Sequence, residues 1–219
     1  MNEISLNLDD IEGVLPANQA RSRDAQIRLM RAGEAVFAEL GYDAARVNDI
    51  AAAAGCSIGS FYRRFQDKEA LFRALQTQFA LRGRENIDRF FAMPAWTTAP
   101  VAEVLRTLVL NTARQIERHP GFFRALFQRS LEGVGAPYFV ALADGDVHAA
   151  RKLAAFLQSR DAAPQGDIDA LCKFAVQSME AVLVQKMLHG GSRISITEPA
   201  LIDQLTRLMT NYLELPRTP

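Results

Sequence analysis

Apolar residues recur along most of the chain at intervals of three and four positions, the spacing that places them on one face of an α-helix. Glycine and proline interrupt this pattern at several points. The stretches between them predict about nine helices, over residues 22–40, 47–54, 58–65, 68–91, 99–119, 122–131, 138–158, 168–188 and 200–213. The sequence shows no strand pattern of useful length, no internal repeat and no low-complexity tract. The predicted fold class is therefore all-α.

Individual residues mark where several of these helices begin and end. Gly41 is expected to stop the first helix, and the pair Pro120-Gly121 to separate the fifth helix from the sixth. Asp67 and Asp167 are expected N-caps, because an aspartate side chain accepts hydrogen bonds from the free amides of a first helical turn. The buried stripe predicted for the first helix consists of Ile27, Met30, Ala35 and Phe37.

Residues 46–65 have the pattern of two short helices joined by a tight turn. Gly55 supplies the positive φ angle that ends the first helix at no steric cost, and Ser57 is placed to cap the second. Phe61 and Phe65 lie one turn apart and give the second helix an inner, apolar face. This is the arrangement of a helix-turn-helix.

The opposite face of the second short helix is polar and basic. It carries Ser60, Arg63 and Arg64, with Tyr62 at its edge. A helix this short is not stable alone, so a scaffold must hold it while its polar face stays exposed. Hydroxyls, a phenol and cations are the groups that contact phosphates and base edges. On spacing alone, an ordinary helical hairpin with a solvated basic face remains the alternative.

Three runs of sequence in this region are distinctive: Leu40–Asp43, Val47–Tyr62 and Phe65–Phe72. Together they closely resemble the N-terminal domain of TetR-family transcriptional regulators. The resemblance covers about residues 23–81. It implies a three-helix DNA-binding domain over residues 21–66 with its helix-turn-helix motif at 46–65. The remainder, 67–219, would be a helical domain for ligand binding and dimerisation, and residues 1–20 an N-terminal arm.

The resemblance also implies which residues meet DNA. We expect Ser60 and Arg63 to contact base edges, and Tyr42 to pack beneath the motif. Lys68 matches the lysine with which the family contacts a phosphate. Arg46 departs from the family pattern, which often has a capping Thr or Ser at this position, but a long cation can still reach a phosphate. The full set of predicted DNA-binding residues is Arg46, Ser57, Ile58, Gly59, Ser60, Tyr62, Arg63 and Lys68.

The predicted C-terminal domain is rich in aromatic residues. Taken one at a time, most of them are expected to be core residues. Taken together, they favour an apolar or aromatic small-molecule effector over a strongly charged one. The candidate pocket residues are Phe91, Trp96, Phe123, Phe127, Gln128, Phe174 and Gln177. Further candidate polar anchors are Arg124 and Glu180.

The last two predicted helices, 168–188 and 200–213, both carry apolar stripes. Val184 and Leu188 widen the first stripe beyond one face, and such a helix needs a second partner. The resemblance implies that this partner is the same pair of helices in another subunit, related by two-fold symmetry. A large core within one chain is the alternative.

Composition narrows the class of protein. The 219 residues are 49% hydrophobic, enough for a substantial core, and the formal net charge is zero. The charge is uneven, because residues 1–20 hold only acidic charges whereas Arg63, Arg64, Lys68 and Arg73 cluster near the motif. Two distant cysteines and three isolated histidines indicate no disulfide framework and no metal site.

No catalytic or cofactor motif is present, so we expect neither an enzyme nor a cofactor. The acidic N-terminus lacks the apolar run of a signal peptide, and no stretch of about 18 uncharged apolar residues appears. These features predict a cytoplasmic protein with no membrane partner.

The sequence therefore predicts a transcriptional regulator, most simply a repressor. A homodimer would bind double-stranded DNA at a palindromic operator and leave it when a small-molecule effector binds. The alternative is a helical ligand-binding or enzymatic protein with a vestigial DNA-binding domain, and an activator is a third option. The arm, 1–20, is expected to be mobile; a short amphipathic segment ending at Ile11 that docks on the body is the competing hypothesis.

Overall fold

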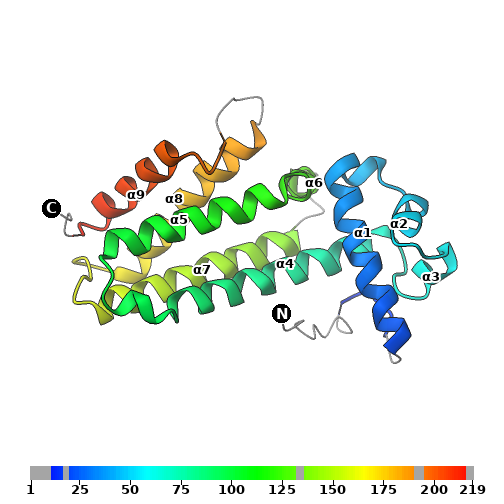
Figure 1. Ribbon diagram of the computed structural model, residues 1–219, viewed down its shortest axis with the longest axis horizontal. Helices are drawn as coiled ribbons and strands as arrows, with labels where there is room; N and C mark the ends of the chain where they lie inside the picture. The colour runs from blue at the N-terminus through cyan, green and yellow to red at the C-terminus, as the bar shows by residue number, and fades with distance from the viewer. Residues whose placement is uncertain (1–10, 17–19, 132–135, 190–194, 216–219) are drawn as a thin grey trace. The chain divides into compact units, whose positions relative to one another are not determined.

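The computed structural model describes residues 11–16, 20–131, 136–189 and 195–215. Over these residues the regular structure is helical, which confirms the predicted all-α class. In chain order, the helices are α1 (Ala20–Ala44), α2 (Val47–Ala53), α3 (Ile58–Tyr62), α4 (Lys68–Phe91), the short 3-10 helix η2 (Pro94–Thr97), α5 (Val101–Arg118), α6 (Pro120–Leu131), α7 (Ala136–Ser159), α8 (Ile168–Leu188) and α9 (Pro199–Tyr212) (Figure 1). Only η2 was not predicted.

The helices form two compact units. The first holds the described residues up to Leu81 together with Gly121–Ala141, and the second holds Arg82–Pro120 with the described residues from Leu142 onward. Consequently α4 and α7 each contribute to both units. The functional division at residue 67 that the sequence suggests stays a prediction.

Aromatic side chains fill the core of the first unit. Phe61 and Phe65, the predicted inner face of the second motif helix, are fully buried, and their rings lie 5.6 Å apart between centroids. Phe72 of α4 packs edge-on against Phe37 of α1 at 5.1 Å and tilted against Phe122 of α6 at 5.7 Å. Rings in these arrangements stabilise a core beyond the area that they bury.

The first helix differs in detail from its prediction. Gly41 has φ 76° and ψ 173°, so the regular helix stops there as expected, and one more turn follows to Ala44. Met30 and Phe37 are buried and Ile27 is partly buried, but Ala35 is exposed. That assignment was wrong because an alanine carries little hydrophobic signal of its own. Leu29 and Val36 occupy the buried face instead.

The second unit is built on α5, α8 and α9, which lie side by side in Figure 1. Each turns one apolar face inward. These faces consist of Val104, Leu105, Leu108, Val109, Ala113 and Ile116 from α5; Cys172, Ala175, Val176, Met179, Leu183 and Met187 from α8; and Ile202, Leu205 and Met209 from α9. Asp167 caps α8 by accepting the Ala170 amide at 3.1 Å, as predicted. Within the described ranges, no helix combines the length and apolarity that a membrane crossing needs.

Gly121 marks a place where two helices of the first unit approach closely. The predicted break between the fifth and sixth helices is present, since α5 ends at Arg118 and α6 begins at Pro120, and Gly121 is the second residue of α6. A Cβ atom at Gly121 would lie 2.0 Å from the backbone oxygen of Ala38 in α1. The absence of a side chain at Gly121 therefore allows α6 to pack directly on the α1 backbone.

We predict that Gly121→Ala lowers the free energy of unfolding by about 1–3 kcal/mol, because the new methyl group meets backbone that cannot move aside. Gly83→Ala is the matched control, since nothing lies within 4 Å of a Cβ at Gly83 in α4. There, alanine should stabilise the helix by up to about 1 kcal/mol. Urea denaturation of both variants measures the difference, and equal effects at the two sites would contradict the packing described.

Candidate nucleic-acid interface

The start of α2 is fixed by backbone contacts around Arg46. This residue is the N-cap, with extended backbone angles, and its carbonyl oxygen accepts the Asp49 amide at 3.0 Å. In return, Oδ2 of Asp49 accepts the Arg46 amide at 3.1 Å. An arginine side chain has no acceptor, so the forward half of a capping box is missing. The exposed guanidinium of Arg46 thus takes no part in the cap.

The turn between α2 and α3 has the predicted geometry. Gly55 has φ 60°, and its amide donates to the carbonyl of Ala52 at 3.0 Å. Ser57 then caps α3, because its Oγ accepts the Ser60 amide at 3.2 Å. The two motif helices are therefore separated by the tight turn that a helix-turn-helix requires.

Polar side chains on α3 form a connected row. Oγ of Ser57 lies 2.9 Å from Oγ of Ser60, and Arg63 donates from its guanidinium to Ser60 Oγ at 3.4 Å. None of the three is fully buried, and Ser57 and Arg63 are exposed. The row offers hydroxyl and guanidinium groups along one side of the helix.

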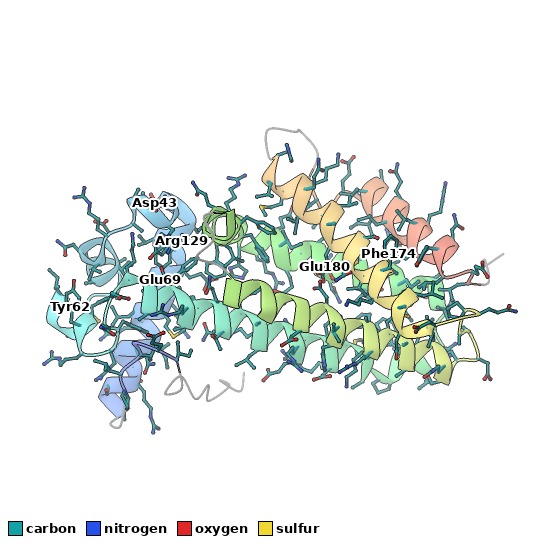
Figure 2. All side chains as sticks on the ribbon, turned by 180° about the vertical axis from the view of Figure 1, so that it is seen from behind. Asp43, Tyr62, Glu69, Arg129, Phe174 and Glu180 are labelled. Atoms are coloured by element: carbon teal, nitrogen blue, oxygen red, sulfur yellow. The ribbon has the colours of Figure 1, made fainter. Side chains whose placement is uncertain are left out.

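The helix α3 is short, and its exposed residues flank one buried anchor. It ends at Tyr62, three residues before the predicted end, with Arg63 as C-cap. Phe61 is fully buried, whereas Ile58 is 45% and Tyr62 51% exposed. The Tyr62 ring meets Phe61 edge-on at 5.4 Å and projects from α3 in Figure 2. Gly59 is also exposed. The helix therefore presents the expected residues outward.

Lys68 is placed differently from its expected phosphate contact. Its Nζ donates to the backbone oxygens of Tyr42 at 2.7 Å, Ala45 at 2.9 Å and Asp43 at 3.4 Å. The ammonium also lies 4.3 Å from the centroid of the Tyr42 ring. Partial burial lowers the pKa of Lys68, while the carboxylate of Asp43 acts in the opposite direction. The Lys68 ammonium thus faces the last turn of α1 and the start of the link to α2.

Tyr42 connects three elements of the first unit. It is buried against Phe37, as expected of a residue beneath the motif, and its hydroxyl donates to Glu69 at 2.5 Å. Arg129 of α6 donates to the same Glu69 oxygen at 2.8 Å, and both residues are labelled in Figure 2. The Arg129 guanidinium also lies 4.2 Å from the Tyr42 ring centroid. Burial and the hydrogen bond to Glu69 raise the pKa of Tyr42 well above its usual value, which keeps the hydroxyl a donor.

The sequence gave no signal for the part that Arg129 plays. Glu69 lies within the run that carries the family resemblance, but Arg129 is 60 residues further along the chain. No local spacing rule connects residues so far apart. Only the packing of α6 on α1 and α4 brings the pair together.

The expected pocket residues fall into both units and do not share one environment. Trp96 and Phe123 are buried, and Phe91 and Phe127 are partly buried. Trp96 donates its indole N–H to the Phe90 carbonyl at 2.6 Å, so its polar group already has a partner.

Three of the expected pocket residues are at the surface. Gln128 and Gln177 are exposed, and Phe174 is 56% exposed, with its ring 5.0 Å from that of Tyr212 in α9. All three lie at the surface of the single chain, because composition indicates aromatic content but not which face of a helix turns inward; their role in a pocket stays a prediction. Glu180 hydrogen-bonds Asp146 of α7; burial and this acidic neighbour raise its pKa well above the usual range.

Ionisable side chains elsewhere in the second unit form ion pairs. Asp88 of α4 lies 2.7 Å from Lys152 Nζ and 2.9 Å from His148 Nε2. The hydrogen bond from Lys152 is the main cause of the lowered pKa of Asp88. The portion of the chain that the structure describes contains no group of three His, Cys, Asp or Glu side chains suited to a metal ion.

Comparison with protein families gives two matches along the chain. Residues 29–75 match the family described as bacterial regulatory proteins, tetR family. Residues 100–213, more than half of the chain, match the family described as tetracyclin repressor-like, C-terminal domain. The first match contains α2 and α3, and the second contains α5 to α9.

Two curated relatives come from Mycobacterium tuberculosis. The chain is 35% identical over 101 residues to the HTH-type transcriptional repressor Rv1474c, which covers 44% of this chain and 53% of that protein. It is 36% identical over 112 residues to the HTH-type transcriptional repressor KstR2, which covers 51% of this chain and 46% of that protein. The matches thus span about half the length of these curated relatives.

Solved structures share the fold over most of the chain. A TetR-family transcriptional regulator from Mesorhizobium loti superposes with a TM-score of 0.73, at 19% identity, over 88% of this chain and 98% of that one. The helical order, the helix-turn-helix and both family matches lead to the same assignment. The chain belongs to the TetR family of bacterial regulatory proteins.

Proposed function

We propose that the protein is a DNA-binding transcriptional repressor. It acts as a homodimer on a palindromic operator in the cytoplasm and is released by a small-molecule effector. One observation carries the proposal: Phe61 is fixed in the core while Tyr62 and Arg63, its neighbours in sequence, are exposed. That arrangement presents the polar face of α3 to a major groove, as a recognition helix requires.

The exposed residues of the motif make two kinds of contact with DNA. Ser60 and Arg63 read base edges, since a guanidinium recognises guanine and a hydroxyl accepts or donates to several bases. Ile58 and Gly59 make the close apolar and backbone approach. The residues that position the protein on phosphates are Arg46, Ser57 and Tyr62. These contacts fix the register of the motif on the duplex without reading sequence.

Lys68 stabilises the motif through contacts within its own chain. Its ammonium hydrogen-bonds two carbonyls in the last turn of α1 and one in the link to α2, so it orients the start of α2. In this role it differs from a phosphate ligand, whose cation must reach the duplex.

The homodimer forms through α8 and α9. Both helices keep large apolar side chains at the surface of the single chain: Phe174, Leu188, Leu208 and Tyr212. Phe174 and Tyr212 are in ring contact, so they make a continuous aromatic patch across the two helices. Burying such a patch against its two-fold copy brings two recognition helices to one operator.

The effector binds in the helical region that follows the motif. Of the candidate contacts in the second unit, Trp96 is buried and Phe91 is partly buried. Their character favours an apolar or aromatic molecule. The effector releases the repressor if it binds more tightly to the conformation with low affinity for the operator. The loss of operator affinity cannot exceed the difference between the effector's affinities for the two conformations.

Arg63→Ala tests the recognition helix, and Arg46→Ala is its matched control. Loss of a base-reading guanidinium should cost about 1–3 kcal/mol at the preferred duplex and relax sequence preference at one position. Loss of a phosphate contact should weaken all duplexes alike and lower the salt dependence by about one unit. Fluorescence anisotropy on a duplex selected from a random library measures both, and no preference for any duplex by the unaltered protein would contradict the proposed function.

Lys68→Met separates support from phosphate contact, because methionine keeps the stem and removes the ammonium. We expect the free energy of unfolding to fall by about 1–3 kcal/mol as three carbonyls lose a charged donor. The dependence of DNA affinity on salt concentration should not change. Unchanged stability together with a salt dependence lower by about one unit would instead identify Lys68 as a phosphate ligand.

Phe174→Glu tests the dimer. A carboxylate at the centre of an apolar interface is costly to bury, so sedimentation velocity should show a monomer where the unaltered chain is a dimer. Gln158→Glu introduces the same charge change at an exposed position near the end of α7 and should leave the dimer intact. A variant that stays dimeric at Phe174 would place the interface elsewhere.

A further inference from the structure

A short segment before α1 pairs with the chain just after the recognition helix. Residues 11–16, which we call the N-terminal strap, form an isolated antiparallel bridge in which Val14 faces Phe65. The amide of Leu15 donates to the Arg64 oxygen at 2.8 Å, and the Gln66 amide donates to the Gly13 oxygen at 2.8 Å. Two hydrogen bonds in opposite directions thus join the strap to 64–66.

The strap also fits closely against α4. Val14 is buried, and a guanidinium nitrogen of Arg73 donates to the backbone oxygen of Glu12 at 3.2 Å. Gly13 has φ 81°, and a Cβ there would lie 2.9 Å from the Cβ of Ala70. A left-handed backbone and this close approach both favour glycine at that position.

For residues 11–16, this arrangement corrects the expectation of a mobile arm. Residues 11–16 are docked through backbone hydrogen bonds and a buried valine. The amphipathic segment proposed as the alternative lies mostly in residues 1–10, outside the described residues.

The strap acts where α3 has least support of its own. The helix has only five residues, so few internal hydrogen bonds hold it. Ser57 caps its beginning, and the chain leaves its end through 63–66. Two backbone groups in that exit, the Arg64 oxygen and the Gln66 amide, find their partners on the strap. The strap thereby fixes the path of the chain between α3 and α4.

Arg64 adds a second fixed point at the same place. Its Nε donates to the Ser22 oxygen in the first turn of α1 at 3.2 Å, while its own oxygen accepts from Leu15. The exit from α3 is therefore held by the strap on one side and by α1 on the other. Arg64 is occupied in this contact, in contrast to the exposed Arg63.

We propose that the N-terminal strap is a positioning element for DNA reading: it sets the direction of α3 relative to α4, and through it the fit of Ser60 and Arg63 to a major groove. This inference rests on the proposed function. It assigns the strap no contact with DNA. Its loss should therefore weaken sequence-specific binding, which depends on the orientation of α3, and spare non-specific binding, which depends on charge.

A substitution at Leu15 isolates the backbone hydrogen bond. The Leu15 side chain is 42% exposed, so Leu15→Ala removes little packing and keeps the amide. Leu15→Pro removes the amide that donates to Arg64. Val14→Ala is a milder second variant, which keeps every backbone hydrogen bond of the strap and removes only part of the buried Val14 side chain. It remains informative if the proline variant does not fold.

The experiment compares affinities for two labelled duplexes, well below the melting temperature of each variant. One is the duplex that the full chain selects from a random library, and the other is a scrambled duplex of equal length. We expect Leu15→Pro to weaken binding to the selected duplex roughly tenfold, the upper range for one hydrogen bond, and to the scrambled duplex less than twofold. Val14→Ala should show the same selectivity to a smaller degree, and Leu15→Ala should behave as the unaltered chain.

Other outcomes distinguish the two proposals. A lower melting temperature with unchanged affinity for the selected duplex would make the strap merely stabilising and overturn the inference. Equal weakening on both duplexes would also overturn it, since the strap would then act through charge or global folding.

If the unaltered chain selects no duplex, the proposed function fails and the inference falls with it. Removal of residues 1–10 alone should leave the selective affinity in place, because the strap remains.

Discussion

The burial of Phe61 determines which way the recognition helix faces. In a helix of five residues one fully buried aromatic ring leaves little freedom of rotation, so the residues beside it must point outward. Phe65 adds a second buried ring one turn later, immediately where the strap pairs with the chain. The apolar core of the first unit thus orients polar groups that have no packing role of their own.

Support for the motif comes from several distant parts of the chain. Lys68 binds carbonyls of the last turn of α1 and of the link to α2, Tyr42 fills the space beneath, and Arg129 joins Glu69 to the Tyr42 ring. Charged groups used in this way are costly to bury unless their hydrogen bonds are satisfied, and here the partners are backbone oxygens and a carboxylate. The arrangement gives basic residues near the motif two separate tasks, since exposed Arg63 can reach a duplex whereas Lys68 is engaged with its own chain.

Local patterns predicted the helices and the motif well, because their signals lie within one turn of the residues concerned. Gly55 has the positive φ that its position required, and Ser57, Asp67 and Asp167 cap helices as expected. Prediction failed where the outcome depends on packing between distant segments. Aromatic content suggested a pocket role for Phe174, but the residue lies on an outer face, and neither the strap nor the Arg129 contact has a signature in sequence spacing.

The central claim is that α3 is displayed twice per assembly to read a duplex. Hydroxyl-radical footprinting of the protein on a duplex selected from a random library tests it most directly. The account predicts two inverted copies of one short sequence, with protected sites whose centres are about 34–36 Å apart if the half-sites are one helical turn apart, or a whole multiple of that spacing. A single protected site without symmetry, or uniform protection along any duplex, would contradict it.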